Sequence, residues 1–125
     1  MKIISGNTSK GGHYSPGVMS HGMLYISGQL PIDHGTGKIA EGGVAEQTRI
    51  ALGNMERVLL AAGMQKEDVV LCRVYIPDIS LWDEANAAYA EFFGAHKPAR
   101  VMVPTTALHH AALIEIEAIA EMEKE

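Results

Sequence analysis

The amino-acid sequence predicts an α+β sandwich, in which one sheet of five or six strands carries two helices on the same face. Two observations predict this class. Two stretches repeat their apolar residues at helical spacing, and the other apolar stretches are short, alternating and rich in β-branched residues. The chain has 125 residues, of which 47% are hydrophobic and 20% charged, so we expect one folded domain over residues 1–125.

Three short strands are predicted in the first part of the chain, one of them at an edge of the sheet. They lie at residues 1–5, 17–20 and 23–28. His21 and Gly22 separate the last two strands, and a polar pair with glycine is typical of a hairpin turn, since glycine adopts positive φ without strain. The glycine-rich residues from Pro31 to Gly43 predict a polar loop.

A long helix follows this loop. The spacing predicts a helix from Val44 to Ala62, because the apolar residues of that range fall on one stripe, while Glu46 and Arg49 lie off it. Gly63 stands where glycine often ends a helix. The stripe indicates that one face of the helix is buried.

The second part of the chain predicts one helix and three strands. The elements are, in order, a strand at residues 68–77, a helix at 80–94 and strands at 99–103 and 113–122. Ser80 and Asp83 resemble a capping box at the start of the helix. Asn86 falls on the apolar face of this helix, where a buried and unpaired amide would cost about 1–3 kcal/mol. The amide either makes a structural hydrogen bond to a neighbouring loop or fixes a loop beside a functional site.

The last strand alternates between two different faces. One face suits packing under helices and the other is mixed: the first carries Ile114, Ile116, Ala118 and Ala120, and the second Leu113, Glu115, Glu117 and Ile119. Leu71 or Cys72 of the central strand would join the second face. A half-apolar sheet face is commonly covered by another copy of the chain. We therefore expect a homo-oligomer, with Arg100 and Glu115 near each other in clefts between subunits.

Composition argues against several classes of protein. The net charge is -5 and no cluster of Lys and Arg is present, so nucleic acid is not the expected partner. The single cysteine, Cys72, excludes an internal disulfide, and its apolar neighbours predict a buried side chain. No apolar run suits a signal peptide or a membrane span, so we expect a soluble, cytoplasmic protein without a membrane partner. The six histidines lack the spacing of a metal site.

Arg100 and Glu115 most need an explanation, because both are charged residues in apolar strands. Arg100 is either a surface charge with an ion-pair partner or a group that grips a carboxylate through two parallel hydrogen bonds. Glu115 and Glu117 share one face, where they form cross-strand ion pairs, face water or include a general acid/base. Glu115 is the better candidate for that chemistry, because Glu117 lies nearer the far end of the strand.

Six stretches of the chain match one known family in that family's order. They are "YSPGV" at 14–18, "YISGQLPID" at 25–33, "EQTRIALGNMERVLLAAG" at 46–63, "NAAYAEFF" at 86–93, "PAR" at 98–100 and "IEIEAIA" at 114–120. Together they resemble the Rid family, also called the YjgF family, of reactive intermediate deaminases. The resemblance covers nearly the whole chain.

The resemblance implies a chorismate-mutase-like mixed sheet with two helices on one face, assembled as a homotrimer with clefts between subunits. It also implies hydrolysis of 2-imino and 2-enamino acids, such as 2-aminoacrylate and 2-iminobutyrate, to 2-oxo acids and ammonia, without cofactor or metal. Arg100 corresponds to the arginine that binds the substrate carboxylate, and Glu115 to the glutamate that positions or activates water. The matching substrate-binding positions are Tyr14, Ser27, Gly28, Asn86, Val101 and Met102.

Departures from the family pattern surround the implied cleft. Val101 and Met102 stand where many active members have serine followed by cysteine or threonine, and His109 and His110 replace proline and a basic residue. These changes leave open a deaminase of one larger substrate, or a non-catalytic trimer that binds a small carboxylate. A ribonuclease or translation inhibitor also appears in the family's naming, and the acidic balance of the chain disfavours it.

Overall fold

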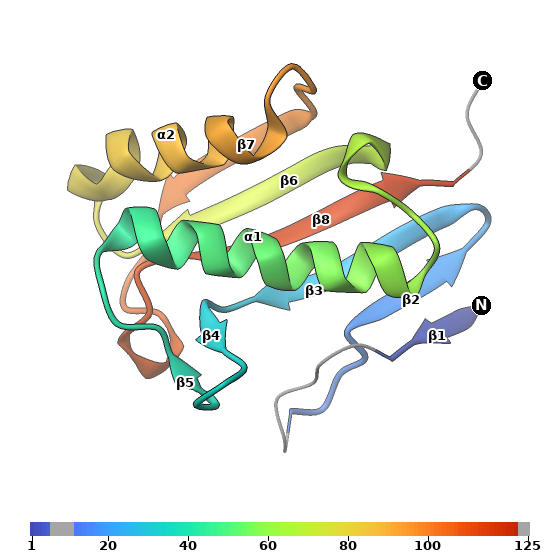
Figure 1. The fold of residues 1–125 in the computed structure, drawn as a ribbon, viewed down its shortest axis with the longest axis horizontal. Helices are drawn as coiled ribbons and strands as arrows, with labels where there is room; N and C mark the ends of the chain where they lie inside the picture. Colours follow the sequence, from blue (N-terminus) through green and yellow to red (C-terminus); the bar gives the residue numbers. More distant parts are fainter. Residues whose placement is uncertain (6–11, 123–125) are drawn as a thin grey trace.

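One six-stranded sheet with two helices on one face makes up the fold (Figure 1). The structure is a computed structural model, and it describes residues 1–5 and 12–122. The strands of the sheet are β1 (Lys2–Ile4), β2 (Gly17–Ser20), β3 (Met23–Gln29), β6 (Val69–Ile76), β7 (Ala99–Pro104) and β8 (Glu115–Glu121). The helices are α1 (Val44–Ala61) and α2 (Trp82–Phe93). The predicted α+β class is confirmed.

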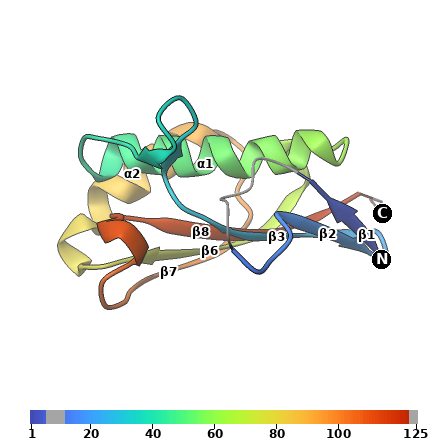
Figure 2. The ribbon, with the colours of Figure 1, turned by 90° about the horizontal axis from the view of Figure 1, so that it is seen from below.

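The strand order is β1-β2-β3-β8-β6-β7, so β8 lies in the interior although it comes last in the chain. Strands β6 and β7 are parallel, and the other neighbouring pairs are antiparallel. The sheet is therefore mixed, and β7 is one of its two edges. Figure 2 shows both helices above the sheet and its other face without a covering layer.

The turn between β2 and β3 forms as its residues predict. His21 has φ 52° and Gly22 has φ 76°, and positive φ at both central residues is the geometry of a type I′ hairpin turn. Gly63, which follows α1, also has positive φ, at 76°, as is common for the glycine that ends a helix. The helix itself ends at Ala61, one residue earlier than expected.

Two local predictions need correction. The residues from Pro31 to Gly43 include a small two-stranded hairpin, β4 (Ile32–Asp33) with β5 (Lys38–Ile39), rather than loop alone. The second helix begins at Trp82 and not at Ser80, because a 3₁₀ turn, η2 (Ile79–Leu81), precedes it. The cap of that turn is Asp78, whose carboxylate accepts a hydrogen bond from the Ser80 N–H at 2.8 Å. The Ser80 and Asp83 capping box is therefore wrong.

Register separates the side chains of the sheet into two sets. On the helix-covered face, one row of paired residues runs through β2, β3, β8, β6 and β7: Gly17, Ile26, Ala118, Cys72 and Arg100. The first four of these residues are buried, and the row ends at Arg100 on the edge strand. Cys72 is fully buried, as its surroundings predict.

The uncovered face carries a continuous apolar row across all six strands. Its paired residues are Ile3, Val18, Tyr25, Ile119, Leu71 and Ala99. None of them is buried within one chain, and Ile3 and Tyr25 are each about half exposed, at 50% and 47%. Leu71, rather than Cys72, is thus the residue of the central strand on this face. Glu115 and Glu117 lie on it too, as the alternation of β8 predicts.

Candidate functional site

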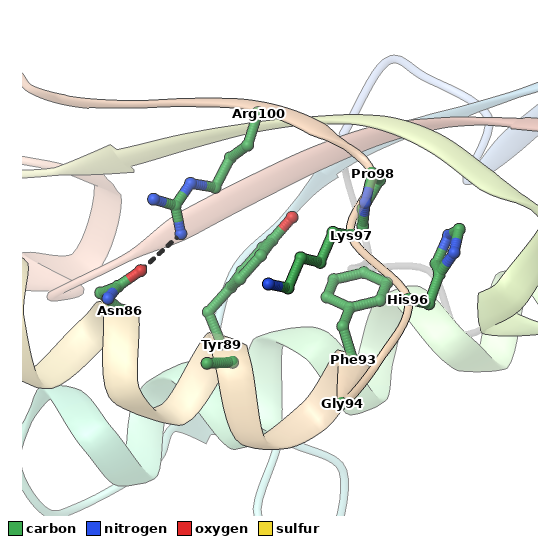
Figure 3. Close-up of a pocket in the computed structure, with 9 residues that line it drawn as sticks. Asn86, Tyr89, Phe93, Gly94, His96, Lys97, Pro98 and Arg100 are labelled. Carbon is green, nitrogen blue, oxygen red and sulfur yellow. Dashed lines mark hydrogen bonds between the residues drawn. The ribbon is translucent and has the colours of Figure 1, made fainter.

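Three side chains of α2 hold Arg100 at the edge of the sheet. The guanidinium donates a hydrogen bond from Nη1 to Oδ1 of Asn86 at 2.7 Å (Figure 3). Its central carbon lies 4.8 Å from the centre of the Tyr89 ring and 5.4 Å from that of Trp82. These three residues recur at helical spacing, so one face of α2 presents two rings and an amide to the arginine.

This arrangement leaves the guanidinium available to a ligand. Over residues 1–5 and 12–122, no carboxylate lies within ion-pair distance of Arg100. One of its five N–H groups donates to Asn86, and the two rings restrict the orientation of the guanidinium plane. An arginine held in this way is preorganised for a carboxylate, which accepts two parallel hydrogen bonds. The amide of Asn86 has a partner as predicted, although the partner is Arg100 rather than a loop.

A hollow of about 340 Å³ adjoins Arg100. It lies between the second half of α2 and the chain that leads from Gly94 to β7 (Figure 3). Tyr89 and Phe93 supply aromatic surface to its wall, and Lys97 supplies a second cation. The Tyr89 hydroxyl is buried, and among the described residues its neighbour is the thiol of Cys72, a weak hydrogen-bond partner.

Glu115 lies on the opposite face of the sheet, against β3. A Cβ at Gly28 would lie only 2.7 Å from Oε2 of Glu115, so the carboxylate as placed lies against the backbone of Gly28 and would have to shift for any larger residue. Burial raises the pKa of the Glu115 carboxyl, and the charge of Glu117 raises it further, while His109 opposes the shift. Gly28 and Glu115, two of the predicted site residues, are therefore brought together.

Glu117 is engaged by its neighbours on β6. The Tyr75 hydroxyl donates to Oε1 of Glu117 at 2.5 Å, and Nη1 of Arg73 lies 3.7 Å from Oε2. This is the cross-strand pairing that was one of the three alternatives for the glutamates. Glu115 makes no such ion pair within the described part of the chain, which favours it as the carboxyl that meets a ligand.

Ser27 and Tyr14 lie where the chain enters the sheet. The Ser27 hydroxyl donates to the backbone carbonyl of Ser15 at 2.6 Å, and its N–H donates to the carbonyl of Pro16 at 2.9 Å. Ser27 therefore fixes the segment that follows Tyr14, whose side chain is 47% exposed. Within one chain, the Ser27 hydroxyl therefore donates its proton to a structural hydrogen bond.

Val101 and Met102 point to opposite sides of β7. Met102 is 9% exposed and packs in the core beneath the helices, so only its backbone is left for a ligand. Val101 is 41% exposed on the uncovered face, in register with Arg73 and Glu117. The two adjacent predicted residues do not line one surface with their side chains.

Arg100 and Glu115 do not meet within one chain. Arg100 pairs with Cys72, on the helix side, whereas Glu115 pairs with Tyr75, on the uncovered side. Strand β6 separates the two, and their register positions differ by three residues. A shared cleft would thus need Arg100 of one chain and Glu115 of another, because the sheet itself stands between them.

Sequence reasoning did not assign Trp82, Tyr89 and Lys97 to the site. The two aromatic residues lie on the apolar face of the predicted second helix, which suits a core position equally well. Their helical spacing around Asn86 was the signal that all three contact the same neighbour. Cys72 lies beside Tyr89, and burial raises the pKa of its thiol to about 11. At neutral pH the thiol is protonated, so it is no nucleophile.

Neither a metal cluster nor a membrane helix is found in the described part of the chain. Over residues 1–5 and 12–122, no three His, Cys, Asp or Glu side chains gather as they do around a metal ion. None of the helices in those ranges combines the length and apolarity that crossing a bilayer requires.

Comparison with known proteins places the chain in a family. The profile of the family described as Endoribonuclease L-PSP matches residues 7–122. The chain belongs to this family. It is the family that the sequence motifs identified under the name Rid, so that resemblance is confirmed.

Members of the family at 33–45% identity span nearly the whole chain. A RutC family protein of Pyrococcus horikoshii is 45% identical over 112 residues, which cover 90% of this chain and 89% of that protein. The human 2-iminobutanoate/2-iminopropanoate deaminase is 38% identical over 121 residues, covering 95% and 88%. The structure of E. coli TdcF with bound serine superposes with a TM-score of 0.89 at 33% identity, covering 98% of this chain and 100% of that one.

Proposed function

We propose that the protein hydrolyses 2-imino and 2-enamino acids to 2-oxo acids and ammonia, in clefts between the subunits of a homotrimer. The observation that carries the proposal is the state of Arg100. Its guanidinium is fixed by Asn86 and two aromatic rings, and no carboxylate of the described chain neutralises it. An anionic ligand with a planar carboxylate is the partner that such a group fits.

The reaction needs little beyond an oriented substrate and one group that accepts a proton and then donates it. Water adds to the electrophilic carbon of the C=N bond, and the resulting carbinolamine loses ammonia as the C–N bond breaks and the carbonyl forms. Arg100 would hold the carboxylate next to this carbon. Glu115 would take a proton from the attacking water and return it to the leaving nitrogen, a contribution of about 10²–10⁴-fold. Its raised pKa suits this exchange near neutral pH.

The uncovered sheet face supports the assembly into trimers. Its apolar row, from Ile3 to Ala99, is exposed or half-buried in one chain, and self-association would remove it from water. Assembly would also let Arg100 of one subunit face Glu115 and Gly28 of its neighbour. The site would then form only where two copies meet.

Named relatives support the same chemistry. The human relative carries the name 2-iminobutanoate/2-iminopropanoate deaminase, and bovine and rat relatives carry it too. The structure of TdcF carries bound serine, an amino acid with the kind of carboxylate that Arg100 would hold in this protein. Imines of simple amino acids are therefore the first substrates to test.

Replacing Arg100 tests the proposal. We expect Arg100→Ala to lower kcat/KM for 2-iminobutyrate by about 100-fold, because the carboxylate loses its two charge-assisted hydrogen bonds. The imine is generated from threonine by a dehydratase, and 2-oxobutyrate release is measured above the spontaneous rate. Arg57→Ala, on the exposed side of α1, is the matched control and should change nothing. Equal rates for the wild type and Arg100→Ala would refute the carboxylate clamp.

Ribonuclease activity is the second candidate, because the family description carries that name. The net charge of -5 gives the chain no general attraction for a phosphate backbone. RNA cleavage by highly purified protein that disappears in Arg100→Ala would support this candidate. Binding of pyruvate without turnover of any imine would instead indicate a carboxylate-binding protein.

A further inference from the structure

Two cationic side chains line the hollow described above. Arg100 and Lys97 both line it, and in Figure 3 their side chains extend toward Tyr89 from opposite sides. Arg100 already accounts for one carboxylate in the proposed reaction. The second cation has no role in that reaction as it stands.

Lys97 is free to meet a ligand. Its ammonium makes no hydrogen bond or ion pair with the described residues, and no acidic residue is among those that line the hollow. His96, which also lines it, is occupied, because its Nε2 lies 2.7 Å from the carbonyl oxygen of Val69. The charge of the hollow is therefore positive, and no acidic residue of the described ranges compensates it.

Tyr89 supplies aromatic surface beside the two cations. Its ring centre lies 4.8 Å from the guanidinium carbon of Arg100, and its side chain is 6% exposed. Its hydroxyl lies next to the buried thiol of Cys72, a weak hydrogen-bond partner, and burial raises the pKa of the hydroxyl. The charges of Arg100 and Lys97 are therefore what the hollow offers to an anion.

We infer that the preferred substrate is a 2-imino acid with a second anionic group, whose first carboxylate lies on Arg100 and whose second group lies toward Lys97. This inference rests on the proposed function and names a substrate class for the same site. Two cations with no carboxylate between them fit a dianion better than a monoanion. Water would convert the 2-imino dicarboxylate to a 2-oxo dicarboxylate and ammonia. The reaction that supplies it is the oxidation of an acidic amino acid at its C–N bond.

Competition between substrates tests the inference on the full chain. An amino-acid oxidase generates the imines of aspartate and glutamate as diacids, and those of alanine and methionine as monoacids. We expect wild-type kcat/KM, corrected for spontaneous hydrolysis, to be about tenfold higher for the diacids. Lys97→Met should lower the diacid-to-monoacid ratio of kcat/KM about tenfold, mainly through KM for the diacids.

Charge reversal and a matched control complete the design. Lys97→Glu should invert the preference and favour imines of basic amino acids over those of acidic ones. Lys38→Met, on the exposed β5 strand, should leave the ratio at its wild-type value. Turnover of monoacid imines with no diacid preference, and no change of the ratio in Lys97→Met, would overturn the inference and leave the proposed function intact. Absence of turnover with every imine would overturn both.

Discussion

At the scale of single residues, position on the sheet determines what each charge can do. Arg100 and Glu117 both have neighbours within reach, but Arg100 meets an amide and two rings, while Glu117 meets a hydroxyl and an arginine. Glu117 is thereby used within the chain. Glu115 has no ion pair among residues 1–5 and 12–122, and burial raises the pKa of its half-buried carboxyl. Arg100 and Glu115 are therefore available to a ligand, whereas Glu117 is not.

The raised pKa of Glu115 predicts a pH-dependent change in stability. A carboxyl whose pKa is higher in the folded than in the unfolded chain binds extra protons when folded, so stability falls as pH rises through that interval. Glu115→Gln should therefore raise the free energy of unfolding at pH 8 by about 0.5 kcal/mol, since the half-buried group is still partly hydrated. At pH 3.5 the gain should vanish.

Urea denaturation at the two pH values measures this difference. Glu84→Gln, on the exposed side of α2, makes the same chemical change away from the sheet and serves as the control. A gain for Glu115→Gln that is equal at both pH values would contradict the assignment, because a neutral packing effect does not depend on ionisation.

The chemistry of these residues could be predicted from the sequence, but the face of the sheet that each side chain occupies could be predicted only in part. Alternation along β8 placed Glu115 and Glu117 on one face correctly, because β8 has buried aliphatic residues at every second position. On β7, Arg100 and Val101 offered no such pattern, and a shift of one residue moves every side chain to the other face. The order of the strands in the sheet could not be predicted either, because pairing between distant segments leaves no signal in the local sequence.

At the scale of elements, the segment before β8 stores backbone strain beside Glu115. In the 3₁₀ turn η3 (His109–Ala111), His110 has φ 56° and Ala111 has φ 57°, a conformation that favours glycine. The rings of His109 and His110 lie 3.8 Å apart between centroids. Strained segments of this kind often lie at functional sites, where the rest of the structure holds them.

Relieving this strain predicts a more stable protein. Ala111→Gly should raise the free energy of unfolding by about 1 kcal/mol, because glycine adopts positive φ without the clash of a Cβ. Ala107→Gly, in the same loop but without positive φ, should instead be neutral or destabilising. Thermal unfolding of both variants distinguishes these cases. Destabilisation by Ala111→Gly as large as that by Ala107→Gly would show that the left-handed backbone costs nothing.

Helices and strands could be predicted where the periodic pattern of apolar residues extends over many residues. The stripe of α1 gave its limits to within one residue, because its buried residues repeat over the whole helix. The start of α2 was not predictable, since Asp78 caps a 3₁₀ turn two residues before the expected Ser80. The β4–β5 hairpin has two residues per strand, too few for any alternation to be recognised.

At the scale of the whole molecule, one chain leaves an apolar face and an incomplete site. The row from Ile3 to Ala99 crosses the entire sheet without cover, and full burial of an aliphatic side chain contributes about 1.5–3 kcal/mol. Arg100 lies at the edge strand on one side of the sheet, and Glu115 lies on the other. We propose that both features have the same explanation, which is that the site forms between copies of the chain.

Mixing two inactive variants tests this claim most directly. Arg100→Ala and Glu115→Gln subunits are co-expressed with different tags, and assemblies that carry both tags are isolated and assayed for imine hydrolysis. Each trimer that contains both kinds of subunit has one cleft of three in which the intact arginine meets the intact glutamate, so the mixed assemblies should recover about one third of wild-type activity. Doubly tagged Arg100→Ala alone should recover none. Mixed assemblies that stay as inactive as either parent would contradict a site shared between subunits.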